Sequence, residues 1–347
     1  MMFYTHVEEN GGLRFRGNTY IWDGTDWEAR IAPNRPRPMA LHNMADAMDG
    51  RGVLLLEDGH YGTWELVNHQ WFEHPVTDGP DTDNVCYRLA TDRSRNRVVC
   101  YGGESRETWE WDGHVWERKY PATSPPVRFY HAMGYHAHAD QLMVFGGCAD
   151  GMTCLNDAWQ WTGTNWVQMN TPNRPPPMCA WDTAYDEKRQ RLIIFGGFVY
   201  NYQEIPGVWE WDGSSWHEYQ PDTMPGELSV HTYLFYDLNM EKTVIYQARP
   251  SGYWTCDTWT WDGSVFDHLD LDYQPDTYEF QASAYDRNTR EAVLNVNGDT
   301  FVGFFVVPTS APTSTPTSTP TATPSATITP TPTCSNTQLP TSTETPI

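Results

Sequence analysis

The sequence predicts an all-β fold, a six-bladed β-propeller of four-stranded antiparallel blades. Three observations point to it: a tryptophan-rich phrase recurs along the chain, two short apolar runs precede most copies, and turn-forming residues separate these runs. The copies are TYIWDGTDW (19–27), TWELVNHQW (63–71), TWEWDGHVW (108–116), AWQWTGTNW (158–166), VWEWDGSSW (208–216) and TWTWDGSVF (258–266). In the last four copies the first tryptophans are fifty residues apart: Trp109, Trp159, Trp209 and Trp259. Such a period indicates a repeat protein whose function belongs to the assembled array.

Two extended runs precede the phrase and supply the first two strands of a repeat. In one repeat they are YHAMGYH at 130–136 and QLMVFGG at 141–147, and in the next they are AWDTAYD at 180–186 and RLIIFGG at 191–197. Short runs rich in β-branched and aromatic residues, bounded by turn residues, are typical of strands. The double glycine that ends the second run permits a close approach of backbones or a positive φ.

The tryptophan phrase itself predicts the third and fourth strands. Because side chains alternate along a strand, Trp109 and Trp111 lie on one face. Asp112 and Gly113 then favour a tight hairpin turn, which places Trp116 on the returning strand. Proline-rich segments follow, and since proline cannot donate to a ladder they mark the passage to the next repeat. Each repeat therefore provides four antiparallel strands.

The order of these pieces predicts how the ring closes. The first tryptophan phrase, at 19–27, precedes every pair of inner strands, and the last inner pair, at 278–298, follows every phrase. We expect the N-terminal hairpin to pair with these C-terminal strands and so complete the sixth blade. The run FVGFFVV at 301–307 competes for the place of the third strand in that blade.

The chain divides into an N-terminal extension at 1–17, the propeller at 18–307 and a Pro/Thr/Ser-rich stalk or linker at 308–347. The last segment has no aromatic residue, no lysine and no arginine, so it cannot bury enough apolar surface to fold. Thr/Ser–Pro tracts of this kind are typical of extended surface stalks open to O-glycosylation, the alternative being a plain disordered tail. We therefore expect a secreted or cell-surface protein, monomeric and part of a larger surface-anchored protein.

Charge and hydropathy exclude two classes of partner. The net charge is −23, from 22 Lys and Arg against 45 Asp and Glu, whereas phosphate binding needs clustered cations. We therefore expect no nucleic-acid partner. No apolar run is long enough to span a bilayer, so we expect no membrane insertion, and the first residues lack the cationic start and apolar stretch of a signal peptide.

The repeat resembles a known family. A double glycine, a loop, one tryptophan and a second tryptophan seven residues on, with Arg128 and His131 ahead of them, look like the kelch repeat, which also forms the central domain of galactose oxidase. The resemblance covers about 18–307 and departs in places, because EDGH at 57–60 and YQAR at 246–249 stand where the double glycine is expected. It implies a propeller; the WD repeat is the weaker alternative, since its period is nearer forty residues.

The loops after the double glycines differ between repeats and are the first candidate site. The three longest lie at 147–157, 197–207 and 247–257 and carry aromatic residues. Aromatic side chains exposed on variable loops are typical of a sugar-binding or protein-binding face. The alternative is that these side chains pack on one another as loop cores. The candidate binding residues are Phe198, Tyr200, Tyr202, Tyr253 and Trp254.

The start of each first strand supplies a second candidate set. One residue per blade is expected at a similar height near the channel: His42, Tyr87, His131, Trp181, Tyr233 and Gln281. In one interpretation His42, Tyr87, His131, Trp181 and the neighbouring Arg128 face a ligand. In the other, the histidines hydrogen-bond to nearby backbone, because buried polar groups are usually satisfied structurally.

Cysteine and histidine spacing predicts no metal site and no cofactor. Cys148 and Cys154 bracket a short loop and suit a loop disulfide, while the other cysteines lack the spacing of a zinc site. His136 and His138 lie two residues apart, but no third ligand is evident, so we interpret them as a surface pair.

Three functions remain, the last of which is a purely structural spacer domain, which predicts no pocket at the channel mouth. The first is a non-catalytic extracellular recognition module that binds a glycan or protein through the variable loop face. The second is a carbohydrate-active or redox enzyme, of the epimerase, lyase or oxidase type, that uses the mouth of the central channel with Arg128 and His131. The sequence favours the first, because no catalytic motif rises above background and only the stalk follows residue 307.

Overall fold

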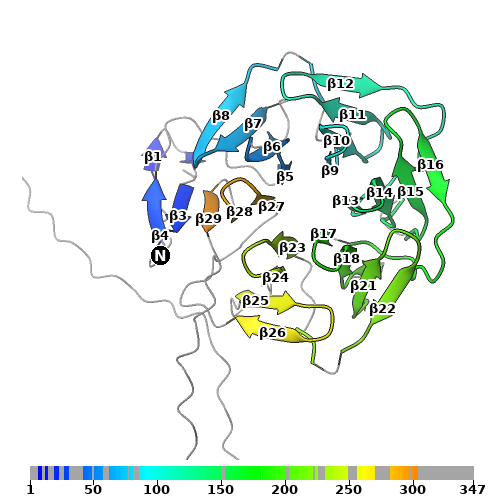
Figure 1. Ribbon diagram of the computed structural model, residues 1–347. Coiled ribbons are helices and arrows are strands. Elements are labelled where there is room, and N and C mark those ends of the chain that lie inside the picture. Colours follow the sequence, from blue (N-terminus) through cyan, green and yellow to red (C-terminus); the bar gives the residue numbers. More distant parts are fainter. Residues whose placement is uncertain are drawn as a thin grey trace, which may run out of the picture.

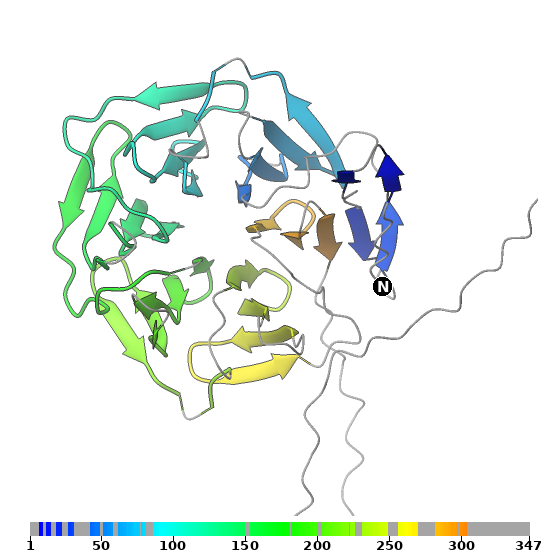
Figure 2. The same ribbon diagram turned by 180° about the vertical axis from the view of Figure 1, so that it is seen from behind.

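A computed structural model describes residues 7–9, 12–14, 19–22, 27–30, 42–48, 51–57, 62–76, 78–80, 86–149, 153–180, 182–199, 203–221, 223–225, 231–248, 256–269, 282–296 and 299–303. These residues form β-sheets arranged as a ring around a central axis, as seen from both sides (Figures 1 and 2). In the part of the chain so described, no helix is long and apolar enough to cross a membrane.

Five sheets are four-stranded and antiparallel, with strands in chain order from the centre outward. The first contains β5 (His42–Asp46), β6 (Val53–Glu57), β7 (Thr63–Val67) and β8 (Gln70–His74). The second contains β9 (Arg88–Asp92), β10 (Arg97–Tyr101), β11 (Thr108–Trp111) and β12 (Trp116–Lys119). The third contains β13 (Ala132–His136), β14 (Gln141–Phe145), β15 (Ala158–Trp161) and β16 (Trp166–Met169). The fourth contains β17 (Ala184–Asp186), β18 (Arg191–Phe195), β21 (Val208–Trp211) and β22 (Trp216–Tyr219). The fifth contains β23 (His231–Asp237), β24 (Lys242–Ala248), β25 (Cys256–Trp261) and β26 (Phe266–Leu269).

The remaining sheet corrects the expectation of six four-stranded blades, because it has five strands. Its order is β27 (Ala282–Asp286), β28 (Glu291–Val296), β29 (Asp299–Gly303), β3 (Thr19–Trp22) and β4 (Trp27–Arg30). The N-terminal hairpin and the C-terminal strands do join in one sheet, as expected. However, β29 lies between them and pairs with β3 in parallel (Figure 1). The segment that follows 298 thus takes the third place and moves the hairpin outward by one strand.

Two small hairpins stand apart from these sheets. One pairs β1 (Val7–Glu9) with β2 (Gly12–Arg14) within the N-terminal extension. The other pairs β19 (Phe198–Val199) with β20 (Gln203–Glu204) in the loop between β18 and β21. The stalk at 308–347 lies outside the described residues.

The tryptophan phrase forms the outer hairpin of each blade, as predicted. Trp111 lies opposite Trp116 across the β11–β12 pair, and their rings are 5.5 Å apart. Asp112 closes the turn by accepting the backbone N–H groups of His114 and Val115, and Gly113 adopts a φ of 100°. The same turn recurs at Asp212 and Asp262.

The hydrophobic core lies between neighbouring sheets. One buried cluster joins Leu54 of the first sheet to Trp109 of the second, and another joins Val99 of the second sheet to Trp161 of the third. Equivalent clusters join every further pair of neighbours around the ring, including the five-stranded sheet with the first and the fifth. The inner strands are therefore held by packing on both sides, and this fixes the residues around the central channel.

Candidate functional site

An aromatic cluster lies where the chain enters two neighbouring inner strands. Tyr87 precedes β9, and Phe129 and Tyr130 precede β13. The ring of Tyr87 meets the rings of Phe129 and Tyr130 edge to face, with centroids 5.5 and 5.3 Å apart. All three side chains are partly exposed. We call Tyr87, Phe129 and Tyr130 the aromatic cluster; they lie on the loop face, the side of the ring where the inner strands begin.

The backbone of Tyr130 has an uncommon conformation. Its φ is 53°, in the left-handed region that bulky residues rarely occupy. Two contacts hold it there: the Tyr130 carbonyl accepts the Ala180 N–H at 2.8 Å, and Phe129 exchanges two backbone hydrogen bonds with Cys148. A strained residue persists only where its surroundings determine it, and such residues gather at functional sites.

Two glycines leave room for the segments that lead into β9 and β13. A Cβ on Gly102 would lie 2.5 Å from the His131 ring and 2.8 Å from Cβ of Tyr87, and a Cβ on Gly147 would lie 2.7 Å from the Phe129 carbonyl. Both glycines also have a positive φ. These glycines therefore serve the strand entry that carries the aromatic cluster.

Phe198 packs against the buried side of the aromatic cluster. It does not form the exposed surface expected from the sequence. It is buried at 8% exposure, and its ring lies 5.8 Å from that of Tyr130. It packs with Cys148 and Cys179, so here the loop-core alternative describes its surroundings. Phe198 and Cys179 are also joined by two backbone hydrogen bonds.

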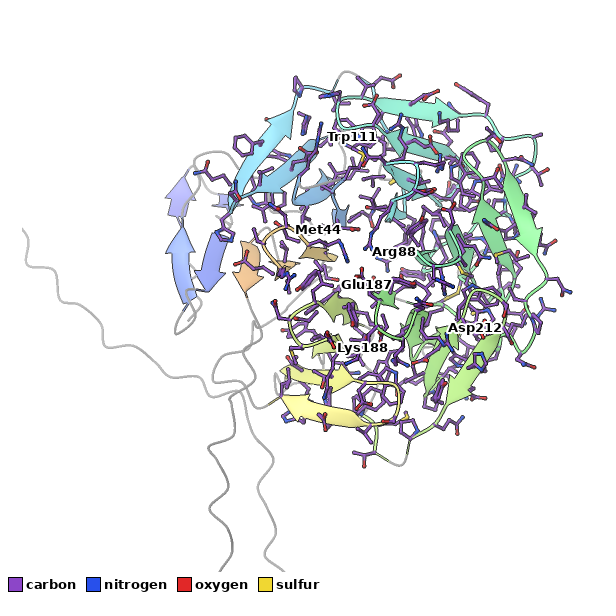
Figure 3. The ribbon with its side chains drawn as sticks, viewed as in Figure 1. Met44, Arg88, Trp111, Glu187, Lys188 and Asp212 are labelled. Carbon is purple, nitrogen blue, oxygen red and sulfur yellow. A yellow bond between two sulfur atoms is a disulfide. The ribbon has the colours of Figure 1, made fainter. Side chains whose placement is uncertain are left out.

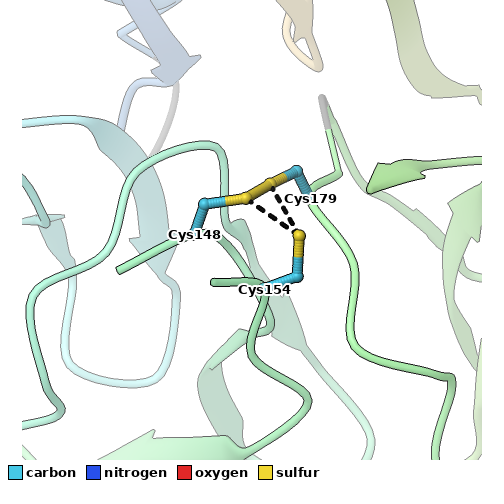
Figure 4. Close-up of side chains that lie close together, drawn as sticks. All are labelled: Cys148, Cys154 and Cys179. Carbon is cyan, nitrogen blue, oxygen red and sulfur yellow. Dashed lines mark hydrogen bonds between the residues drawn. A yellow bond between two sulfur atoms is a disulfide. The ribbon is translucent and has the colours of Figure 1, made fainter. Parts of the chain in front are cut away.

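The disulfide pairing differs from the expected Cys148–Cys154 bond. Cys148 is bonded to Cys179, Cys86 is bonded to Cys100, and Cys154 is a free thiol beside the first pair (Figure 4). The reason is the packing of neighbouring blades, which brings Cys179 next to Cys148 although they are 31 residues apart in sequence. The sequence shows only the short separation of Cys148 and Cys154.

Arg128 and His131 are both fully buried. Arg128 donates to the Gly146 carbonyl and to the Asp157 carboxylate, each at 2.9 Å, so it ties the strand entry to the loop before β15. The His131 ring packs near Tyr87 and Tyr101, and its nitrogens have no well-aligned hydrogen-bond partner among the described residues. Burial, together with the positive charges of Arg128 and Arg88, lowers the pKa of His131 well below its usual value. In the structure His131 therefore packs beneath Tyr87, and Arg128 braces the backbone from which Phe129 and Tyr130 extend.

The inner strands also enclose a cavity of about 130 Å³ on the ring axis. Its lining takes residues from all six sheets of the ring, among them Met44, Ala90, Met133, Asp182, Phe235 and Ser283. Figure 3 shows Met44, Arg88 and Glu187 toward the middle of the ring and Trp111 and Asp212 toward its rim. The volume is below the ~300–1,000 Å³ typical of small-molecule sites.

Asp182 is an ionisable group in the wall of this cavity. It lies two residues after Ala180, whose backbone N–H bonds to the Tyr130 carbonyl. Its carboxylate accepts the Leu234 N–H at 3.0 Å and the Ser283 hydroxyl at 2.8 Å. Burial raises the pKa of Asp182, against the opposing influence of Arg88. The carboxyl is thus fixed in position by groups from two other sheets.

Ion pairs span the channel at its other end, where the inner strands finish. Arg93 contacts Asp46 at 3.2 Å and Glu187 at 3.0 Å, and Arg287 contacts the same Glu187 at 2.5 Å. Burial opposes ionisation of Glu187, but the hydrogen bonds and charges of Arg287 and Arg93 outweigh it and lower its pKa. These four residues belong to four different sheets or to the turns that follow their inner strands, so this network links four blades at the turn end of the channel.

The histidine pair has a structural place. His136 is fully buried, and its Nδ1 accepts the Ala139 N–H while Nε2 contacts the Gln190 carbonyl at 3.2 Å. Among the residues that are described, the group with metal-ligating atoms close together is Cys148, Cys154 and Cys179. This group was not anticipated, because its third member belongs to another repeat.

Several candidates from the sequence lie outside the described residues: Trp181, Tyr200, Tyr202, Tyr253, Trp254 and Gln281. His42 begins β5, but its side chain is not described; Tyr233 is buried. Of the predicted residues, Arg128, His131, Tyr87 and Phe198 do lie together. Sequence reasoning missed Phe129, Tyr130 and Asp182, although Phe129 and Tyr130 stand directly between Arg128 and His131.

No family model matches the sequence, and no curated protein matches it. Solved structures do match. YjhT aligns with a TM-score of 0.56 at 12% identity, over 76% of this chain and 92% of that one. A triple arginine-to-alanine mutant of AofleA from Arthrobotrys oligospora aligns with a TM-score of 0.51 at 12% identity, over 74% and 78%.

The fold is a β-propeller. At this level of identity the likeness to the two structures concerns the fold alone. Within the propeller, the aromatic cluster lies on the loop face, and the ion pairs of Glu187 lie at the opposite end of the channel.

Proposed function

We propose that the chain is a non-catalytic recognition module that binds a glycan or a protein through the loop face of a kelch-type propeller, secreted or displayed at the cell surface. Counting the five-stranded sheet, this propeller has six blades. The observation that carries the proposal is the aromatic cluster, in which three partly exposed rings meet at the entry of two inner strands.

The chemistry of the cluster supports a binding role. Tyrosine and phenylalanine offer large apolar faces with little conformational entropy to lose, and tyrosine adds a hydroxyl that hydrogen-bonds to polar ligands. Such faces suit the C–H surface of a sugar ring or a hydrophobic side chain of a protein partner. The left-handed backbone of Tyr130 and the disulfide beneath it hold the rings in place before a ligand arrives.

The test is binding by glycan and protein arrays with the purified protein, followed by titration of the best ligand. We expect Tyr87→Ala and Phe129→Ala to weaken binding at least tenfold, which is about 1.4 kcal/mol. Tyr130→Asn is the suitable third variant, because asparagine tolerates a positive φ. Phe72→Ala is the matched control, since Phe72 is a half-exposed ring on the outer strand β8. Binding that survives all three cluster variants would reject the loop face as the site.

Asp182 favours a second candidate function, a carbohydrate-active enzyme that uses the channel. A carboxyl with a raised pKa is suited to general acid–base catalysis near neutral pH. The small cavity and the hydrogen bonds that already occupy this carboxylate count against it. A sugar-turnover screen settles the choice: activity that is present in the wild type and lost in Asp182→Asn would establish the enzyme, and its absence leaves the recognition module.

A further inference from the structure

Three sulfur atoms lie together under the aromatic cluster. Sγ of Cys154 is 3.2 Å from Sγ of Cys148 and 3.9 Å from Sγ of Cys179, while Cys148 and Cys179 are bonded to each other (Figure 4). A separation of about 3–3.5 Å is within the range of reacting atoms, provided that the attacking sulfur lines up with the bond that breaks. Because Cys154 also lies close to Cys179, its side chain must rotate to reach that alignment before it attacks. We propose that these residues form a thiol–disulfide exchange site, in which Cys154 replaces Cys179 as the partner of Cys148.

The backbone already accommodates the alternative bond. Cys148 and Cys154 lie opposite each other in an antiparallel bridge. The hydrogen bonds that flank them run from Ala149 to Thr153 and from Leu155 to Gly147, so the cysteines form a non-hydrogen-bonded pair. The Cα atoms of such a pair are about 4.5 Å apart, inside the roughly 4.4–6.8 Å range of disulfides. The existing bond has a Cα separation of 6.0 Å, also within that range. Both pairings therefore fit the same fold with little more than side-chain rotation.

The exchange balances without an external oxidant or reductant. The Cys154 thiol loses its proton to solvent, and its sulfur attacks Sγ of Cys148. A Cys148–Cys154 bond forms as the Cys148–Cys179 bond breaks, and Cys179 leaves as a thiolate that takes up a proton. Attack on Cys148 is favoured over attack on Cys179 because Cys148 is the nearer sulfur.

Exposure gives the two isomers different reactivity. Cys154 is partly exposed, whereas Cys148 and Cys179 are buried at 3% and 0% exposure. The free thiol is thus accessible in the Cys148–Cys179 form and buried in the Cys148–Cys154 form. In the first form a covalent bond ties the loop after β14 to the segment that enters β17; in the second that tie is absent. The exchange therefore changes how firmly Phe198 and Tyr130 are held.

Disulfide mapping in acid tests the proposal, because acid stops exchange. Cyanogen bromide cleaves after Met152, Met169 and Met178, so Cys148, Cys154 and Cys179 fall on three different fragments unless a disulfide joins two of them. We expect the wild-type protein to contain both isomers, and their interconversion after a change of conditions to speed up about tenfold per pH unit while the attacking thiol is mainly protonated. A single pairing at every pH would overturn the proposal.

Two variants and an internal control complete the test. Cys154→Ser removes the attacking thiol and is expected to hold Cys148–Cys179 at every pH. Cys179→Ser is expected to form Cys148–Cys154 in a glutathione redox buffer; if both thiols stay reduced there while Cys86–Cys100 forms, the alternative pairing is excluded. Cys86–Cys100 is the control, because the described residues place no third cysteine beside it, and it should keep one pairing throughout.

Discussion

Trp166 donates its indole N–H to the hydroxyl of Thr108 at 2.8 Å, across the boundary between the third and second sheets. Trp116 makes the same bond to Thr63 at 2.9 Å, one blade earlier. The next member of the series breaks the pattern. Ala158 stands where Thr108 stands, and the buried indole N–H of Trp216 has no partner in the part of the chain that the structure describes. In the following blade Val208 stands at the threonine position and Phe266 at the tryptophan position. Neither side chain can form this hydrogen bond.

Ala158→Thr is therefore expected to stabilise the protein. Ala158 and Trp216 belong to one buried cluster, so a hydroxyl at 158 supplies the acceptor that Trp216 lacks. The expected gain is about 1 kcal/mol in the free energy of unfolding, measured by urea denaturation. Thr108→Val is the matched control; it keeps the volume but strands the indole N–H of Trp166, and should cost about 1–3 kcal/mol. If Ala158→Thr lowers the free energy of unfolding, or if both variants change it by the same amount in the same direction, the hydroxyl does not matter at this boundary.

The glutamate within the tryptophan phrase gives a second prediction. Glu210 is fully buried, accepts Arg189 at 2.7 Å, and accepts the Trp261 indole of the next blade at 2.7 Å. Glu210→Leu leaves the buried indole N–H of Trp261 without its acceptor and removes one of the two carboxylates that pair with Arg189, the other being Asp186. We expect a loss of about 1–3 kcal/mol in the free energy of unfolding.

Gln160 is the control for this prediction, because it occupies the same position in β15 without an arginine partner. Its amide makes one long contact, 3.4 Å to the Asp140 carbonyl. Gln160→Leu is expected to change the free energy of unfolding by no more than about 0.5 kcal/mol. A similar loss in both variants would mean that the apolar substitution, and not the lost ion pair, destabilises the hairpin.

The sequence was a good guide to each blade taken alone. The outer hairpin and its turn follow from Trp109, Trp111 and Asp112, because turn chemistry and side-chain alternation are local properties. The parallel pairing of β29 with β3 was not predicted in that form, since it depends on where the two ends of the chain meet.

The candidate site was predictable only in part, for the same reason. Tyr87, Arg128 and His131 were identified from their place before the inner strands. The Cys148–Cys179 bond and the position of Phe198 depend on contacts between blades, which no local spacing encodes. The aromatics Phe129 and Tyr130 were adjacent to known candidates, but their exposure and the φ of Tyr130 emerge only in the folded ring.

The ion pairs at the turn end of the channel predict a pH dependence. The pKa of Glu187 is lower in the folded chain than the usual ~4.3. The contribution of Glu187 to the free energy of unfolding is therefore present above about pH 4.3 and is lost as the pH falls through the pKa of the folded state. Glu187→Gln should therefore be less stable than the wild type at pH 7, and the difference should shrink by pH 3.5 in urea titrations.

Glu241→Gln is the control for the channel network. Glu241 pairs with Lys188 at 2.6 Å, but both side chains are largely exposed, and such pairs contribute little. The wild type and this variant should unfold at nearly the same urea concentration at both pH values. If Glu187→Gln behaves in the same way, the network does not stabilise the turn end of the channel.

His131→Phe separates a structural role from a ligand-binding role. The pKa of His131 is lowered well below its usual value by burial and by Arg128 and Arg88, so the folded state holds the ring neutral while the unfolded state protonates near pH 6.5. Stability from this group is complete above about pH 6.5 and declines as the pH falls below it, by up to about 1.4 kcal/mol per pH unit. Phenylalanine does not titrate and suits the surrounding aromatic rings, so the variant should gain on the wild type as the pH falls from 7.5 to 5. His114→Gln is the matched control, because His114 is an exposed histidine of the β11–β12 turn. Because His131 is fully buried, ligand binding at pH 7.5 should persist in His131→Phe. If this variant loses ligand binding while its free energy of unfolding is unchanged, His131 belongs to the binding site.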